Sequence, residues 1–493
     1  MPTSLSTSSP ALLPALPSEI NQNLEYALPL YIGRLPEHLR AQDIRFLASR
    51  GALSIPKDEL RNELLKAYLH HVHAYMPMID LEELLRAITQ SDGAHQFSLL
   101  LFQAIMFAGV AFIDQDHLQA AGYPSRKSAR EIFFEKSRLL FDFDCEMDHI
   151  TLIQSLLLMT YWDDAKTSET NIGSWMGVTV SLAHSIGLHL DPETCDMGLP
   201  RQKMRKIVWW SLYARDRLLA LIARRPTQVN MDDCTVPLLT PDDFTLRPFP
   251  AEWVRIVGGT GFPQNIHEQR QLILIFIEKV KLCFTLGRVL STQYRAFTPN
   301  SDSISSTNVC ETHLRSQDLE SWLSNIPPEA HYMPPHGAEL GKVDGTVHSA
   351  RALLRVIYLS ALIALYHQQF LPSTAFQSFK DGQWEKISAA KLRSAAVNII
   401  KIIHDLHLLS LTNHHPMTFI SLLIPAVIVH LKDVRSEDPI VRIVGLQRLY
   451  QGVGILQQLC DMHGPTGLPT SFPKSIALTV DSYPAMRQNY LHS

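Results

Sequence analysis

Two adjacent aspartates, Asp163 and Asp164, are the first residues in this sequence whose types and spacing could carry chemistry. Glu169 is close to them, and paired carboxylates of this kind can hold a magnesium ion. A magnesium-dependent helical enzyme also needs a second acidic site. The segments around Asn230 and Asn300 lack the spacing of such a site. The sequence therefore favours a solvated helix end here and predicts no catalytic residue.

Histidines and cysteines are the usual ligands of zinc, and neither is placed as a zinc site requires. His70, His71 and His73 are close together, but His70 and His73 have no adjacent Glu or Asp. None of the six cysteines forms a Cys-x-x-Cys pair; they are residues 145, 195, 234, 283, 310 and 460. The sequence predicts no metal site and no binuclear zinc cluster within the chain. The thiols are expected to be reduced and mostly buried, in an intracellular protein.

The glycines at 258, 259 and 261 resemble the glycine turn of nucleotide-binding proteins. That turn must follow a strand and open a helix, because the helix N-terminus binds the phosphates. Pro263 follows at once, and the surrounding segments have helical rather than strand periodicity. We expect a loop and no bound cofactor.

The segment from Met204 to Leu238 contains a carboxylate in an apolar setting. On a helical wheel, Asp216 shares a face with bulky apolar residues, including Trp209 and Tyr213. An unpaired carboxylate there would be costly, so it should be paired or hydrogen-bonded. The hypothesis is that Arg225 or Arg217 holds Asp216 and that the pair fixes the helix onto the loop 230–237.

The order of residues in this segment resembles the middle homology domain of fungal zinc binuclear-cluster transcription factors. The resemblance rests on a Trp-Trp pair, an Asp-Arg pair, an Arg-Pro pair and the pattern Asp-Asp-Cys-x-Val-Pro. The matching residues are Trp209, Trp210, Ser211, Tyr213, Asp216, Arg217, Arg225, Pro226, Asp232, Asp233, Cys234, Val236 and Pro237. One residue departs from the pattern: Arg224 stands where the family usually has Gly. This departure puts in doubt the tight turn with which the helix usually ends in the family.

Hydrophobic periodicity predicts helices through most of the chain and no strand. The helices are expected over 81–88, 97–113, 126–143, 150–161, 174–186, 268–296, 348–369, 387–409, 417–431 and 441–462, with another ending at Ser324. A further helix is expected to begin at Asp58 and end at Pro77. Asp80 and Asp148 are expected N-caps, and Gly187 is an expected left-handed C-cap.

The chain is expected to form one large, irregular all-α domain over residues 57–465. Residues 1–20 are expected to be a disordered tail, 21–56 a lead-in segment and 466–493 a C-terminal tail. The Pro-rich connector 239–265 and the loops within 298–345 are expected to separate sub-lobes. The resemblance covers about residues 30–465 and implies the fungal transcription-factor regulatory fold.

Composition agrees with a globular protein that does not itself attract nucleic acid. Apolar residues make up 46% of the chain and charged residues 19%, and the net charge is −4. No basic surplus is present, as a free-standing DNA binder would show. The longest apolar run, Phe97–Ile113, is short for a bilayer, so no membrane contact is expected.

The resemblance implies a non-catalytic regulator of transcription in the nucleus, controlling a metabolic or secondary-metabolite gene set. The partners of such a regulator would be the transcription machinery or a full-length zinc-cluster factor. The resemblance also allows a small-molecule effector. DNA contact is expected only indirectly, or through an N-terminal module that this sequence does not contain. Two alternatives stay open: a helical enzyme such as a terpene cyclase-like protein, and a zinc-less competitor of full-length family members.

Overall fold

The computed structural model describes residues 28–162, 170–258, 265–294, 304–334, 345–367, 382–409, 411 and 418–463. These residues form sixteen α-helices, and their only β-pairing is an isolated bridge between Ile32 and Phe97. The predicted all-α fold is confirmed. The expected tails 1–20 and 466–493 lie outside the described residues, as do Asp163, Asp164 and Glu169.

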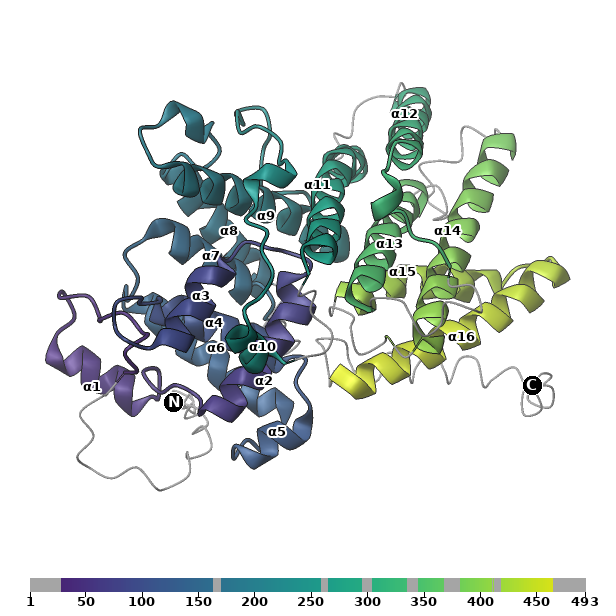
Figure 1. The fold of residues 1–493 in the computed structure, drawn as a ribbon. Helices are drawn as coiled ribbons and strands as arrows, with labels where there is room; N and C mark the ends of the chain where they lie inside the picture. Colours follow the sequence, from purple (N-terminus) through teal and green to yellow (C-terminus); the bar gives the residue numbers. More distant parts are fainter. Residues whose placement is uncertain are drawn as a thin grey trace, which may run out of the picture.

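The first ten helices form the larger lobe, drawn in purple to teal in Figure 1. They are α1 (Ala41–Ser49), α2 (Asp58–Tyr68), α3 (Leu81–Gln90), α4 (Leu99–Val110), α5 (Gln115–Ala120), α6 (Arg126–Asp142), α7 (His149–Met159), α8 (Thr170–Ser185), α9 (Leu199–Ala223) and α10 (Ala251–Val257). Helix α4 contacts α2, α6 and α7, which places it at the centre of this lobe.

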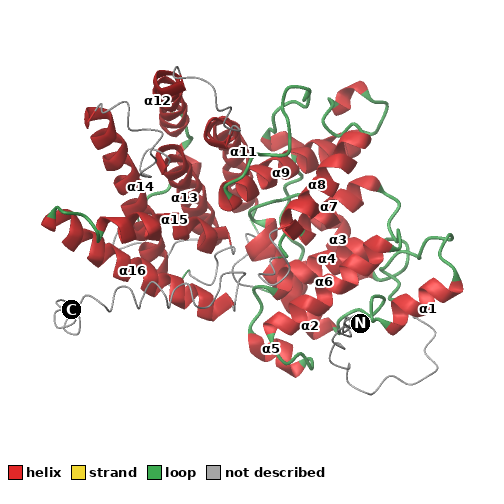
Figure 2. Ribbon diagram, turned by 180° about the vertical axis from the view of Figure 1, so that it is seen from behind, coloured by secondary structure: helices red, strands yellow, loops and turns green. Residues whose placement is uncertain are grey.

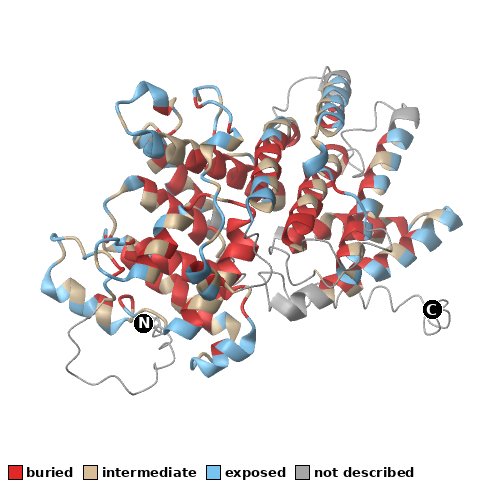
Figure 3. Cartoon of the chain, viewed as in Figure 1, coloured by how far each residue is buried: buried red, intermediate tan, exposed pale blue. Residues whose placement is uncertain are grey.

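The remaining helices form a second lobe, in which α11 borders the first lobe and the other helices lie on the far side of α11 in Figures 1 and 2. They are α11 (Ile266–Tyr294), α12 (Ile304–Ser324), α13 (Gly345–His367), α14 (Gly382–Leu408), α15 (Thr418–Asp433) and α16 (Pro439–His463). Helix α11 packs on α9 and also on α13. It therefore joins the two lobes, and the buried residues of both belong to one hydrophobic cluster (Figure 3).

Helix α4 is central because every one of its residues is buried. Its near-uniform apolar surface was the reason to expect this position. Ser98 caps its N-terminus by accepting the Leu101 amide at 3.2 Å. Gly109 lets α2 come close, since a Cβ at this position would lie 3.1 Å from the carbonyl carbon of Leu64.

The predicted helix ends are confirmed where polar caps marked them. Asp80 accepts the amides of Glu82 and Glu83 at the start of α3, and Asp148 accepts that of Thr151 in α7. Gly187 follows α8 with φ of 63°, the left-handed conformation that glycine adopts without strain.

Two segments differ from the expectation. The helix expected to run from Asp58 to Pro77 is α-helical only to Tyr68, and Leu69–His73 form a π-helical turn. Hydrophobic spacing does not reveal this change, because all five residues of the turn are buried and no exposed face marks the shift. The connector 239–265 is not wholly irregular either, since it contains α10, which buries Trp253 and Val257.

Helix α13 is long and apolar enough to cross a membrane by length and composition alone. However, 83% of its most apolar stretch is buried inside the protein. In Figure 3 it lies among the other helices of the second lobe. These contacts identify it as a core helix, and it is longer than the run Phe97–Ile113 to which the sequence points.

Candidate functional site

The candidate site is built on the C-terminal half of α9 and the loop 230–237 that follows it. Two adjacent tryptophans hold this loop against the helix. Trp209 Nε1 donates to Cys234 Sγ at 3.2 Å, and Trp210 Nε1 donates to the Pro237 carbonyl at 2.8 Å. Both indoles are buried, so each N–H needs such an acceptor. The Trp-Trp pair and the Cys-x-Val-Pro pattern therefore contact each other, since each tryptophan donates to one residue of the pattern.

Asp216 forms a second connection between α9 and the chain that follows it. Its side chain is 1% exposed, as its place among apolar residues predicted. The carboxylate accepts the Gln228 amide at 3.0 Å and the Val229 amide at 3.1 Å, and it pairs with Arg217 at 2.5 Å. The buried charge is thus compensated by one cation and two backbone donors.

Only one of the two cations proposed for Asp216 pairs with it in the structure. Arg217 makes the ion pair, and Arg225 makes none with it. The guanidinium of Arg225 instead lies against Gly173 of α8, where a side chain would collide with it. The attachment point also differs from the expectation, because Asp216 holds residues 228 and 229 rather than the loop 230–237.

Arg217 also links α9 to α11. Its guanidinium lies 4.1 Å from the ring centre of Tyr213, and a Cβ on Gly287 of α11 would lie 3.1 Å from its Nε. The glycine therefore leaves room for the cation between the two helices. The Tyr213 hydroxyl donates to the Cys283 carbonyl at 3.4 Å, and burial raises the pKa of Tyr213 to about 12. This tyrosine acts as a hydrogen-bond donor and not as a base.

The two signature aspartates of the loop, Asp232 and Asp233, are exposed, and Asp232 bonds within the loop. Asp232 accepts a bond from Asn230 at 3.2 Å. The following Thr235 joins the loop to the segment after α8, because its amide donates to the His189 carbonyl at 3.0 Å. Burial raises the pKa of the Cys234 thiol, so this cysteine is an acceptor for Trp209 and not an activated nucleophile.

Arg224, the residue that departs from the family pattern, retains the geometry of a glycine. It lies at the C-cap of α9 with φ of 51° and ψ of 50°, and its amide donates to the Ala220 carbonyl. The tight turn at the end of α9 is therefore present, although arginine stands where the family usually has glycine. An arginine in this left-handed conformation costs about 1–2 kcal/mol relative to the ordinary helical region.

Arg215 is also buried in α9, and it was not among the residues predicted from the sequence. It donates to the side chain and the carbonyl of Thr160, at 2.9 and 3.0 Å, and lies 4.0 Å from the ring centre of Tyr161. These contacts join α9 to the end of α7. The run Arg-Asp-Arg was the only signal, and the partner of this cation is a helix end that no spacing rule identifies.

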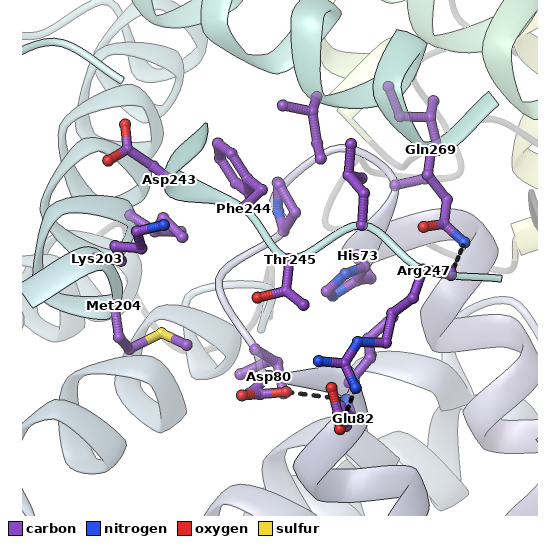
Figure 4. A pocket seen from close by; sticks show the side chains of 18 of the residues that line it. His73, Asp80, Glu82, Lys203, Met204, Asp243, Phe244, Thr245, Arg247 and Gln269 are labelled. Atoms are coloured by element: carbon purple, nitrogen blue, oxygen red, sulfur yellow. Dashed lines mark hydrogen bonds and ion pairs between the residues drawn. The ribbon is translucent and has the colours of Figure 1, made fainter. Parts of the chain in front are cut away.

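A pocket of about 170 Å³ lies between α3, the start of α9, the connector and α11 (Figure 4). Two of its acidic residues are in ion pairs: Glu82 binds Arg247 at 2.7 Å, and Asp243 binds Lys206 at 2.9 Å. Of the other charged residues in its lining, Asp80 caps α3 and Lys203 donates to the Asp242 carbonyl. Burial lowers the pKa of His73 to about 3, so this imidazole is neutral at physiological pH. The pocket therefore presents mainly apolar walls, and its charged side chains already have partners within the protein.

The described residues contain no group of three or more His, Cys, Asp or Glu that could hold a metal ion. His70, His71 and His73 are all buried, and His71 stacks on Phe112 with ring centres 4.4 Å apart. The glycine turn begins at the end of α10, with Gly258 at φ of 78°, and its later glycines lie outside the described residues. Helices, not strands, flank it.

This fold and this arrangement define a class of protein. The chain belongs to the fungal-specific transcription factor domain family, whose profile matches residues 65–326. The match includes α9, Asp216 and the loop 230–237, the segment on which the resemblance was based. It is a family of transcription factors and not of enzymes.

Individual relatives refine this placement. The chain is 34% identical over 461 residues to cutinase transcription factor 1 beta of Fusarium vanettenii, covering 90% of this chain and 52% of that protein. It is 31% identical over 425 residues to transcription factor cpaR of Aspergillus oryzae, covering 83% and 70%. It is 21% identical over 409 residues to the fusaric acid cluster transcription factor FUB12 of Gibberella fujikuroi, covering 83% and 56%.

The chain spans about half the length of most of the curated relatives that it matches. No solved structure matches it.

Proposed function

We propose that this protein regulates transcription and that its helical domain, over about residues 57–465, is the part that receives the signal. A ligand or a protein partner would shift the population between two packings of the helices. The observation that carries the proposal is the family match over residues 65–326, a range that includes α9 and the loop 230–237. No step of this function requires bond-making chemistry.

The gene set proposed for this regulator is metabolic. The relatives are named for cutinase, for acetamidase and for the fusaric acid cluster, each of which concerns metabolism. The proposed site of action is the nucleus. The proposed partners are the transcription machinery and a full-length zinc-cluster factor, so that DNA is contacted through a zinc-cluster module on a partner or elsewhere in the protein.

A reporter assay tests this function. The full chain is fused to a heterologous DNA-binding domain, and expression of a reporter gene carrying that domain's binding site is measured in a fungal cell. We expect the fusion to change reporter expression several-fold relative to the DNA-binding domain alone. Equal expression from the two, with the fusion accumulating in the nucleus, would contradict the proposal.

A further inference from the structure

A second pocket, of about 230 Å³, lies where the end of α9 meets α11, α13 and α15. Its walls are mainly apolar and come from three helices; Leu221, Ile222, Ile363, Ala364 and Leu422 form them. A concave apolar site with a few convergent polar groups is the usual form of a small-molecule site. The polar groups decide which ligand it would take.

Arg224 supplies the charge of this pocket. It lines the pocket and makes no ion pair with a described residue, whereas Glu82, Arg247 and Asp243 of the pocket in Figure 4 are each paired. Its backbone also adopts the left-handed conformation, which is unfavourable for any residue with a side chain. Strain retained at one residue points to a role for its side chain.

Two neighbouring basic residues, His367 and Lys432, interact with Arg224. Burial lowers the pKa of His367 to about 4, with Arg224 and Lys432 lowering it further. Burial and Arg224 also lower the pKa of Lys432. The imidazole is therefore neutral at physiological pH, and a bound anion would pair with the guanidinium of Arg224.

Two further polar groups in the pocket lack a hydrogen bond that such groups normally make with the described residues. Ser360 is 3% exposed and its hydroxyl has no hydrogen bond with a described residue, although buried hydroxyls are normally bonded. Pro425 lies inside α15 and has no N–H, so the carbonyl of Ser421 lacks its helical donor. The pocket is lined by Ser360, Ser421 and Pro425. A ligand with an acceptor and a donor could satisfy them.

We propose that this pocket binds a small organic acid, whose carboxylate pairs with Arg224 and whose apolar body lies between α13 and α15. The volume is below the roughly 300–1,000 Å³ of pockets for drug-sized ligands, which favours a compact acid. A phosphate ester fits less well, because most of the wall is apolar. This inference rests on the regulatory role proposed above, since it supplies the signal that the domain receives.

Binding of hexanoate to the purified full chain, measured by calorimetry, tests the proposal. Hexanamide is the matched neutral probe. We expect saturable binding of hexanoate, about tenfold tighter than that of hexanamide, because a charge-assisted bond is lost in the amide. Equal affinity for the two probes, or no binding of hexanoate, would overturn the proposal. The assay involves no transcription, so this failure is distinct from a failed reporter assay.

The variant Arg224→Gly removes the cation without endangering the fold, because glycine favours the left-handed conformation at this position. We expect it to lower hexanoate affinity about tenfold and to leave hexanamide binding unchanged. The control is Ser91→Gly, which relieves the same conformation at the end of α3, where Ser91 has φ of 44°. It should change neither affinity. Unchanged hexanoate binding by the Arg224→Gly variant would also overturn the proposal.

Discussion

Asp216 is the residue on which the packing of the signature segment depends most. It is almost wholly buried and satisfies Arg217 together with the amides of Gln228 and Val229. Removing one partner of a buried ion pair leaves the other charge uncompensated. The cost then exceeds the net worth of the pair itself. The exposed Asp232 has no comparable surroundings, although it belongs to the same sequence signature.

The variant Asp216→Asn is therefore expected to destabilise the protein by about 3–5 kcal/mol. Its amide nitrogen would face N–H donors, and Arg217 would lose its counter-charge. Urea denaturation followed by circular dichroism measures the loss. The control Asp232→Asn, of the same chemistry but exposed, should change stability by less than about 0.5 kcal/mol. Similar values for the two variants would contradict the role given to Asp216.

Lys136 in α6 gives a pH dependence that can be assigned to one residue. Burial lowers its pKa to about 8, and its Nζ donates to the Ser54 hydroxyl at 2.8 Å. The unfolded lysine has a pKa of about 10.4, so the unfolded state binds more protons between these values. Stability should therefore rise with pH from about 8 to 10.4, by up to about 3 kcal/mol from this residue.

The variant Lys136→Met should lose that rise. The Ser54 carbonyl keeps a donor, Gln103 at 2.9 Å, so the change leaves no orphaned acceptor there. Denaturation midpoints measured between pH 7.5 and 10.5 give the slope, in which Lys279 should still contribute because burial lowers its pKa to about 8 as well. The exposed Lys127, on the same helix, provides the control Lys127→Met, whose slope should match that of the wild type. Equal slopes for Lys136→Met and Lys127→Met would refute the assignment.

At the scale of the helices, close approach matters as much as polarity. Helices α2 and α4 meet at Gly109, where a Cβ would collide with the backbone at Leu64. Because the obstacle is backbone and not a flexible side chain, α2 would have to move. Gly109→Ala should therefore destabilise the protein by about 1–3 kcal/mol, although alanine favours helix.

Thermal denaturation of the Gly109→Ala variant tests this. Gly454→Ala in α16 is the matched control, because a Cβ there would meet nothing within 4 Å. It should raise stability by up to about 1 kcal/mol through helix propensity alone. A gain of stability in both variants would show that α2 and α4 accommodate a Cβ at residue 109, and it would contradict the close approach inferred for these helices.

The sequence predicted the helices and several caps because local interactions decide them. Asp80 and Asp148 act within one turn, and the uniform apolar surface of α4 has only one reasonable location. The π-helical turn at 69–73 and α10 were missed because packing, not periodicity, produces them. For the site, residue types predicted that Asp216 needs a cation, but its backbone donors carry no side-chain signal. Both pockets are assembled from distant segments, so sequence alone could not reveal them.

At the scale of the molecule, the two lobes share one hydrophobic core through α9, α11 and α13. A shared core couples the stability of parts that are distant from each other, as a domain that transmits a signal requires. Leu100 in α4 and Leu449 in α16 are both fully buried, one in each lobe. They allow this coupling to be measured with a single type of substitution.

Leu100→Ala and Leu449→Ala should each cost about 2–5 kcal/mol, the usual range for a buried leucine. If the lobes unfold as one unit, each variant lowers amide-exchange protection in both α4 and α16 by the same free energy. Hydrogen exchange followed by mass spectrometry reads the two helices separately. Loss of protection confined to the mutated lobe would mean that the lobes unfold independently. A ligand between α9, α13 and α15 would then act on the second lobe without reaching the contacts of Asp216.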